Sequence, residues 1–269
     1  MNRRERRRQA KQQKKGPGAG GSPPTADDGL ADYHFHLGGE LERQGDAEGS
    51  LAAYRQAVGL RPGYADAWME LGLVLNRLDR LDDALEALRR AVLAGPDFAL
   101  AYYNFGCVLE RAGLVDKARD VYEEAARLKP DFLEAHYALA GAWKRLNDFD
   151  AALKGYRRAI DIAKARGPDF APALAGLANT LRELGHTDEA RDTFARAIAL
   201  DPGNAGFRIK AALVLPVIPG SAQEIAAARR TFADNLEALV GGGLRLSDPY
   251  NEVGVTNFYL AYHEQDNRA

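Results

Sequence analysis

The chain has 269 residues, of which 46% are hydrophobic and 28% charged, and its formal net charge is −2. This apolar content excludes a wholly disordered chain, and the near-balanced charge argues against a dedicated nucleic-acid binder. The single cysteine, Cys107, excludes an internal disulfide and a multi-cysteine metal site, so we expect a reducing, cytoplasmic setting. No apolar run is long enough to span a membrane, and the basic N-terminus lacks the apolar stretch of a secretory signal.

The first 15 residues carry eight basic residues and one acidic residue, a local charge of +7, and the rest of the chain has a net charge of −9. A stretch rich in glycine and proline follows at 16–24. We therefore expect residues 1–30 to form a disordered basic tail and linker. The tail is either a solvated arm or a contact for nucleic acid or an anionic membrane. The second use is less favoured, because the tail lacks the aromatic residues that stack on bases.

From Ala31 onward the sequence repeats itself at steps of 34, 34, 34 and 38 residues. Small residues recur first at Gly38, Gly72, Gly106, Ala140 and Ala178 and then at Ser50, Ala84, Ala118, Ala152 and Ala190. Apolar residues four apart, such as Leu37 and Leu41, share one helix face beside each small residue. Each unit is therefore predicted to be a hairpin of two closely crossing helices.

This pattern resembles the tetratricopeptide repeat. The resemblance covers five copies, at 31–64, 65–98, 99–132, 133–170 and 171–204. One hairpin cannot bury its apolar face alone, so the stacked copies are expected to form an all-α, right-handed superhelical solenoid with a concave groove. The fourth copy holds four extra residues within 160–167, about one helical turn, which predicts a longer second helix with a protruding turn.

The resemblance implies that the first helix of each hairpin lines the groove. Two sets of side chains recur there. The first, which we call the aromatic set although one member is methionine, is Phe35, Met69, Tyr103 and Tyr137. The second, the arginine set, is Arg43, Arg77, Arg111 and Arg145. Aromatic faces and guanidinium groups together suit acidic peptides, which predicts a protein or peptide ligand with acidic side chains. The alternative interpretation is that both sets are ordinary helix surface.

Two groove chemistries of this repeat family require particular residues. A carboxylate clamp needs Lys and Asn in the first copy and basic residues in the third, but the corresponding places hold Phe35, Gly39, Glu70 and Leu100. An asparagine ladder that grips peptide backbone would occupy His36, Glu70, Asn104, Ala138 and Gly176. Asn104 is the one match, so neither chemistry is expected as a whole, and Asn104 remains a candidate groove residue.

Three other residues are predicted to be structural. His34 and His136 occupy the place at which Trp68 and Tyr102 pack between hairpins, so we expect both histidines in the core. Cys107 replaces a small inward residue, and its spacing puts no histidine or lysine beside it. We therefore expect no reactive thiol at this place.

The segment 205–247 departs from the repeat and is predicted to be a helical adaptor, with Ser221 and Glu224 forming a capping-box pattern. The stretches 208–218 and 257–263 resemble bacterial SPINDLY-type O-GlcNAc transferase homologues, in which this part joins the repeats to the catalytic lobes. The resemblance implies that 248–269 begins a catalytic-region-like segment. It also implies that His263 lies at the nucleotide-sugar site, although Glu264 follows it where the family has glycine.

The chain ends at Ala269, before any alternating strand–helix pattern, and shows no glycine-rich phosphate loop or paired acid–base site. We expect no cofactor, no metal and no glycosyl transfer by this chain alone. The leading hypothesis is a protein-interaction scaffold that resembles the non-catalytic region of a protein O-GlcNAc transferase. Two alternatives remain open: a fragment of an active UDP-GlcNAc-dependent enzyme, and a nucleic-acid or membrane adaptor that acts through the tail.

Overall fold

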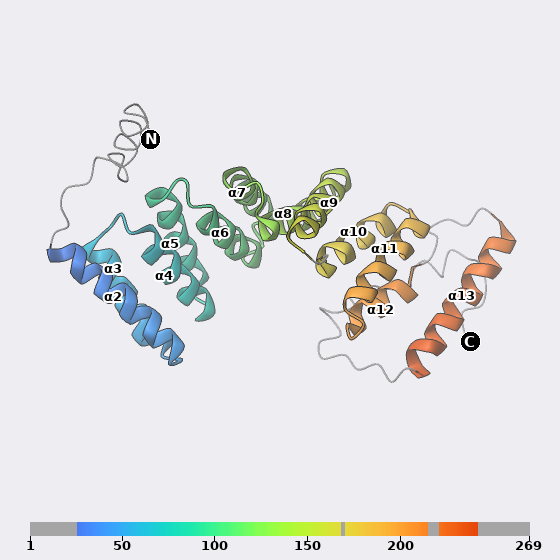
Figure 1. The fold of residues 1–269 in the computed structure, drawn as a ribbon, viewed down its shortest axis with the longest axis horizontal. Helices are drawn as coiled ribbons and strands as arrows, with labels where there is room; N and C mark the ends of the chain where they lie inside the picture. The colour runs from blue at the N-terminus through green and yellow to red at the C-terminus, as the bar shows by residue number, and fades with distance from the viewer. Residues whose placement is uncertain (1–25, 168–169, 215–220, 242–269) are drawn as a thin grey trace, which may run out of the picture.

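A computed structural model describes residues 26–167, 170–214 and 221–241. In these ranges the regular structure is entirely α-helical, and twelve helices follow one another along an arc (Figure 1). The helices are α2 (Ala26–Arg43), α3 (Ala47–Leu60), α4 (Ala65–Arg77), α5 (Leu81–Ala94), α6 (Ala99–Arg111), α7 (Val115–Leu128), α8 (Leu133–Arg145), α9 (Phe149–Arg166), α10 (Ala171–Glu183), α11 (Thr187–Leu200), α12 (Ala205–Ala212) and α13 (Ala222–Gly241). The predicted all-α solenoid of helix hairpins is confirmed.

Five hairpins form the repeats: α2–α3, α4–α5, α6–α7, α8–α9 and α10–α11. The turn inside each hairpin contains one residue with a positive φ, namely Gly45 (81°), Asp79 (60°), Gly113 (78°), Asn147 (61°) and Gly185 (80°). Glycine, asparagine and aspartate are the residues that adopt this left-handed backbone most readily. The turn chemistry therefore ends each first helix at the same place in the repeat.

The first helices form the inner layer of the arc, and the second helices form the outer layer. Each first helix packs on its own second helix and on the second helix before it. Consecutive first helices also touch, as α4 does with α6 and α6 with α8, whereas consecutive second helices do not pack on one another to this extent. Neighbours approach more closely on the concave side of a curved stack, so the first helices form the concave side of the arc.

Each of the first three hairpins closes around a glycine on its first helix. A Cβ added to Gly38 would lie 2.6 Å from Tyr54 Cε1, and a Cβ added to Gly72 would lie 2.6 Å from Leu88 Cγ. At Gly106 the added atom would collide with the ring of Tyr122. The two helices can cross at this distance only because the Cβ is missing, since protein interiors leave no spare volume.

The fourth hairpin meets the same constraint differently, because its crossing residue is Ala140. The facing residue on α9 is Gly155, and a Cβ there would lie only 2.8 Å from the Ala140 Cβ. Tyr156 in turn lies against the bare backbone of Gly176 in the fifth hairpin, where an added Cβ would meet its ring. Two glycines therefore supply the room that a glycine at residue 140 would have given.

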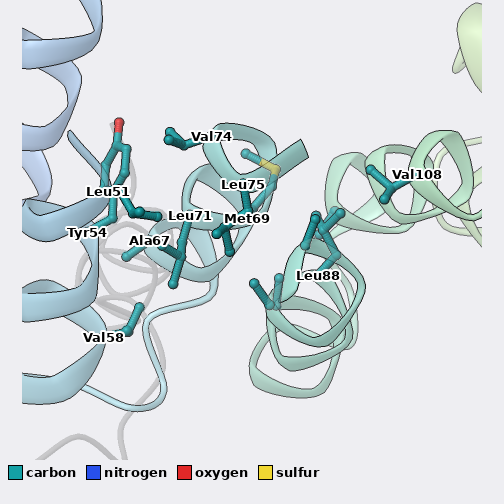
Figure 2. Close-up of a cluster of buried hydrophobic side chains, with 14 of the residues drawn as sticks. Leu51, Tyr54, Val58, Ala67, Met69, Leu71, Val74, Leu75, Leu88 and Val108 are labelled. Atoms are coloured by element: carbon teal, nitrogen blue, oxygen red, sulfur yellow. The ribbon is translucent and has the colours of Figure 1, made fainter. Parts of the chain in front are cut away.

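The largest core cluster crosses from one hairpin to the next. Figure 2 shows side chains from α3, α4, α5 and α6 in one cluster, among them Tyr54, Leu71, Leu88 and Val108. These four side chains are at most 4% exposed. Because the cluster crosses the hairpin boundaries, neighbouring repeats stabilise one another, as expected for a solenoid.

The first helix begins at Ala26, five residues before the predicted start of the first repeat. Asp27 and Asp28 lie in its first turn, where the helix dipole favours carboxylates. Arg61 Nε lies 3.0 Å from Asp28 Oδ1, and Arg61 Nη2 lies 2.9 Å from Asp32 Oδ1. Residues 26–30 are therefore helical rather than part of the linker, and the rest of the predicted tail, 1–25, lies outside the described residues.

The extra residues of the fourth copy lengthen α9, as predicted. This helix has 18 residues, whereas α3, α5, α7 and α11 have 14 each. The added turn does not simply protrude, because Ile162 and Ala163 are buried. Arg166 Nη2 also lies 2.9 Å from Asp131 Oδ2 in the turn before α8. One side of the added turn is therefore packed, and the other faces solvent.

Two helices follow the fifth hairpin. Asn204 Oδ1 accepts a hydrogen bond from the Phe207 backbone N–H at the start of α12 (3.1 Å), and Ser221 Oγ accepts one from the Glu224 N–H before α13 (3.1 Å). The capping predicted at Ser221 is thus observed, and α13 ends at Gly241. No helix in the described ranges combines the length and apolar character needed to cross a lipid bilayer.

The crossing constraint makes a direct prediction for Gly106→Ala. Its Cβ would collide with Tyr122, so the free energy of unfolding should fall by about 1–3 kcal/mol. Gly59→Ala on α3 is the matched control, because nothing lies within 4 Å of its added Cβ; it should gain about 0.5–1 kcal/mol from helix propensity. Urea denaturation followed by circular dichroism measures both changes, and equal effects from the two variants would contradict the account.

Candidate peptide-binding face

The aromatic set lies where the two helices of one hairpin meet the start of the next. The ring centroid of Phe35 is 5.0 Å from that of Tyr64, and Tyr103 is 5.2 Å from Phe132 in the same relation. Tyr137 is likewise 5.3 Å from Phe170. The rings of Phe35, Tyr103 and Tyr137 are half-buried. The fourth member, Met69, is only 4% exposed and belongs to the core. The aromatic set therefore packs the repeat junctions and is only partly accessible to a ligand.

The arginine set reaches back to the preceding repeat. Arg77 pairs with Glu42, and Arg145 Nη1 lies 2.8 Å from Glu110 Oε1. In both cases the carboxylate stands on the last turn of the preceding first helix, 35 residues earlier in the chain. These ion pairs join consecutive first helices near their C-terminal ends.

The other two arginines have different partners. Arg111 Nη1 lies 2.7 Å from Asn76 Oδ1, and its Nη2 lies 2.6 Å from Asp79 Oδ1. Arg43 of the first repeat pairs with Glu40 on its own helix at 2.5 Å. All four guanidinium groups are thus engaged within the chain, and those of the second, third and fourth repeats join neighbouring hairpins.

The last junction reverses the charges. Lys144 Nζ on α8 lies 2.9 Å from Glu183 Oε1 on α10, so the base now precedes the acid. Lys144 stands directly before Arg145, as Glu110 stands directly before Arg111. These partners were not predicted from the sequence. The available signal was an acidic residue 35 residues before the arginine, one more than the repeat period, as for Glu42 and Arg77. We call the contacts at the four junctions the edge ladder: Glu42–Arg77, Asn76/Asp79–Arg111, Glu110–Arg145 and Lys144–Glu183.

Two acids of the edge ladder are also bound from the outer layer. Tyr54 Oη donates to Glu42 Oε2 at 3.2 Å, and Tyr122 Oη donates to Glu110 Oε2 at 3.1 Å. Burial, with the nearby carboxylate adding to it, raises the pKa of Tyr54. Burial likewise raises the pKa of Tyr122. Both hydroxyls therefore remain protonated donors, and each of the two glutamates links three helices.

Between the two sets lies a part of the inner face with small or unpaired polar side chains. Asn104 on α6 is half-buried, and its amide makes no hydrogen bond with any described residue. One turn further along α6, Cys107 is half-buried, and burial raises the pKa of its thiol, which lowers the fraction of thiolate. On α4, burial also raises the pKa of the Glu70 carboxyl. Of the candidate groove residues, Asn104 thus has the most freedom to bind a ligand.

The two histidines predicted in the core are half-buried rather than fully enclosed. His136 Nε2 lies 3.1 Å from the Pro130 carbonyl, as the Trp68 indole N–H donates to the Pro62 carbonyl at 2.8 Å. His136 therefore repeats the role of the tryptophan at this place. Among the described residues, no group of His, Cys, Asp or Glu side chains could hold a metal ion. His263 lies outside the described residues.

Three models of the tetratricopeptide repeat match the chain, over residues 35–99, 99–132 and 131–202. Together they cover more than half of the sequence without a gap. The chain is a tetratricopeptide-repeat protein. None of these matches reaches the stretch beyond 202 that carries the resemblance to O-GlcNAc transferases.

Several solved structures share this fold. PilW, described as a widely conserved type IV pilus biogenesis factor, is 20% identical over 78% of this chain and 93% of its own, with a TM-score of 0.62. PilF of Pseudomonas aeruginosa is 19% identical over 81% and 95%, with a TM-score of 0.61. YrrB, described as a tetratricopeptide-repeat protein with an unusual peptide-binding site, is 22% identical over 70% and 91%, with a TM-score of 0.56. A comparison with curated proteins finds no match.

The edge ladder predicts the outcome of a charge swap at the last junction. Lys144→Glu and Glu183→Lys should each lower the free energy of unfolding by about 0.5–1 kcal/mol, because like charges would then face each other on side chains that are about 30% exposed. The double swap should recover part of that loss. A double-mutant cycle in urea measures the coupling, and strictly additive losses would contradict the pairing.

Proposed function

We propose that this tetratricopeptide-repeat protein is a scaffold that binds an extended peptide segment of a partner protein along its inner face. The observation that carries the proposal is Asn104, whose half-buried amide on the inner layer has no partner among the described residues. An amide in this state can bind both the N–H and the C=O of a peptide backbone. The peptide-binding site named for YrrB supports the same use of the fold. We also propose a cytoplasmic location, supported by the free thiol of Cys107.

The arginine set can bind an acidic ligand only through the N–H donors that the contacts of the edge ladder do not use. Arg77, Arg111 and Arg145 remain 54%, 45% and 48% exposed. A guanidinium group has five N–H donors, and the contacts to the preceding repeat use only some of them. A ligand carboxylate can therefore share the guanidinium group with the carboxylate that already holds it. The acidic peptide predicted from the sequence remains our proposal for the ligand.

A phage-displayed library of random peptides, panned on the full chain, supplies the probe for this proposal. Asn104→Ala should weaken the selected peptide about fivefold, the value of one hydrogen bond. Arg77→Glu combined with Arg111→Glu should weaken acidic peptides further. Gln56→Ala, on the exposed side of α3, is the matched control and should change nothing. Unchanged affinity in the inner-face variants, measured by fluorescence anisotropy, would refute the proposal.

A second candidate function rests on the stretches 208–218 and 257–263. We propose that the chain corresponds to the front part of a protein O-GlcNAc transferase, in which the groove would select the substrate and His263 would join the donor site; the sequence resemblance alone supports this. We expect no sugar transfer from radiolabelled UDP-GlcNAc to a selected peptide by residues 1–269. We also expect strand–helix units to be encoded downstream of Ala269. A stop codon there would contradict this candidate and leave the scaffold proposal intact.

A further inference from the structure

One second helix differs in charge from the other four. The helix α9 contains five basic and two acidic residues, a net charge of +3. The equivalent helices α3, α5, α7 and α11 have net charges of 0, −1, −1 and −1. The basic helix is also the one that carries the extra turn, which adds Lys164 and Arg166 to it. Two irregularities of the fourth repeat, in length and in charge, therefore fall on the same helix.

Bases on the other second helices are largely neutralised by acids of their own helix. Arg89 Nε and Arg90 Nε lie 2.9 Å and 2.7 Å from the Glu86 carboxylate, and Arg127 Nε lies 2.8 Å from Glu124. Surface pairs of this kind contribute little to stability, but they match most of the cations on these helices; Arg55 on α3 and Lys117 on α7 are the exceptions without an ion pair among the described residues. On these helices the surface therefore offers little net charge to a partner.

On α9 no base pairs with an acid of its own helix, and Arg166 is the one base of this helix that pairs with a described carboxylate elsewhere, that of Asp131. Lys154, Arg157 and Lys164 are exposed and form no ion pair with a carboxylate of the described residues. Arg158 Nη2 donates to the Pro130 carbonyl at 3.1 Å and likewise meets no carboxylate there. We call these four residues the α9 basic stripe. They are spaced so that they share one helix face, and they extend over about 15 Å.

One acidic residue, Asp161, lies on the same helix face as the α9 basic stripe. It lies three or four residues from Arg157, Arg158 and Lys164, so it lowers the local positive charge without forming an ion pair. The exposed side of α9 carries no aromatic ring and no large apolar side chain. It therefore lacks the stacking surface of a single-stranded nucleic-acid site and the apolar wedge of a membrane-surface helix.

We propose that the α9 basic stripe is a second docking surface, on the outer layer, for an acidic helical segment of a partner protein. Carboxylates at helical spacing would pair with cations that the chain itself leaves unmatched. The stripe lies on a second helix, whereas the peptide-binding face lies on the first helices, so the two surfaces can be occupied independently. Binding should weaken as salt is added, because exposed charges are screened.

The test uses a fluorescein-labelled Glu-rich helical peptide, with the full chain and two variants of equal net charge. The first variant is Lys154→Gln with Arg157→Gln and Lys164→Gln. The control is Arg55→Gln with Arg89→Gln and Arg127→Gln, which are exposed on the other second helices. The α9 variant should weaken binding about tenfold and the control less than about twofold. Asp161→Asn should strengthen binding about twofold, and circular dichroism checks that each variant is folded.

Equal losses in the two triple variants would overturn the proposal, because they would show an effect of net charge alone. So would a loss confined to Arg77→Glu with Arg111→Glu, which would place the peptide in the groove. An oligo-dT strand or phosphatidylserine vesicles that bind through the stripe, while the Glu-rich peptide does not, would also overturn it. Failure of Asn104→Ala to affect groove ligands would bear on the inner face only and would leave this proposal untouched.

Discussion

The distance between the two helices of a hairpin is the constraint on which the rest of this structure depends. In the first three repeats a glycine on the first helix lies directly against a large residue of the second, Tyr54, Leu88 or Tyr122. The fourth repeat keeps the same crossing with Ala140, because Gly155 opposite Ala140 and Gly176 beside Tyr156 have no side chain. This exchange shows that free volume at the crossing, rather than glycine itself, is what the fold requires.

The functional surfaces follow from that crossing. Closely crossed hairpins stack with their first helices nearer to one another than their second helices. The inner layer then brings Glu110 within reach of Arg145 and Lys144 within reach of Glu183, while Asn104 on α6 stays without a partner among the described residues. Consecutive second helices contact one another less, so a charged side chain on one of them does not have to match a charge on the next. α9 departs from its equivalents there without disturbing the core.

The sequence predicted the hairpins and the longer α9 because their signals are local: small residues, turn residues and the repeat period. It did not predict the partners of the arginine set, because an ion pair such as Glu42–Arg77 depends on how one repeat sits on the next. The early start of α2 was missed for a similar reason, since Arg61 from the far end of the hairpin binds Asp28. The open amide of Asn104 was found only by comparison with a family groove chemistry, and its lack of a partner is visible only in three dimensions.

Photo-crosslinking tests the central claim, that ligands lie on the inner layer, most directly. A library-selected peptide carrying a benzophenone group would be irradiated with the full chain, and the crosslinked residues identified by mass spectrometry. We expect crosslinks on the first helices, above all on α6 near Asn104. Crosslinks confined to the second helices α5 and α7 would contradict it.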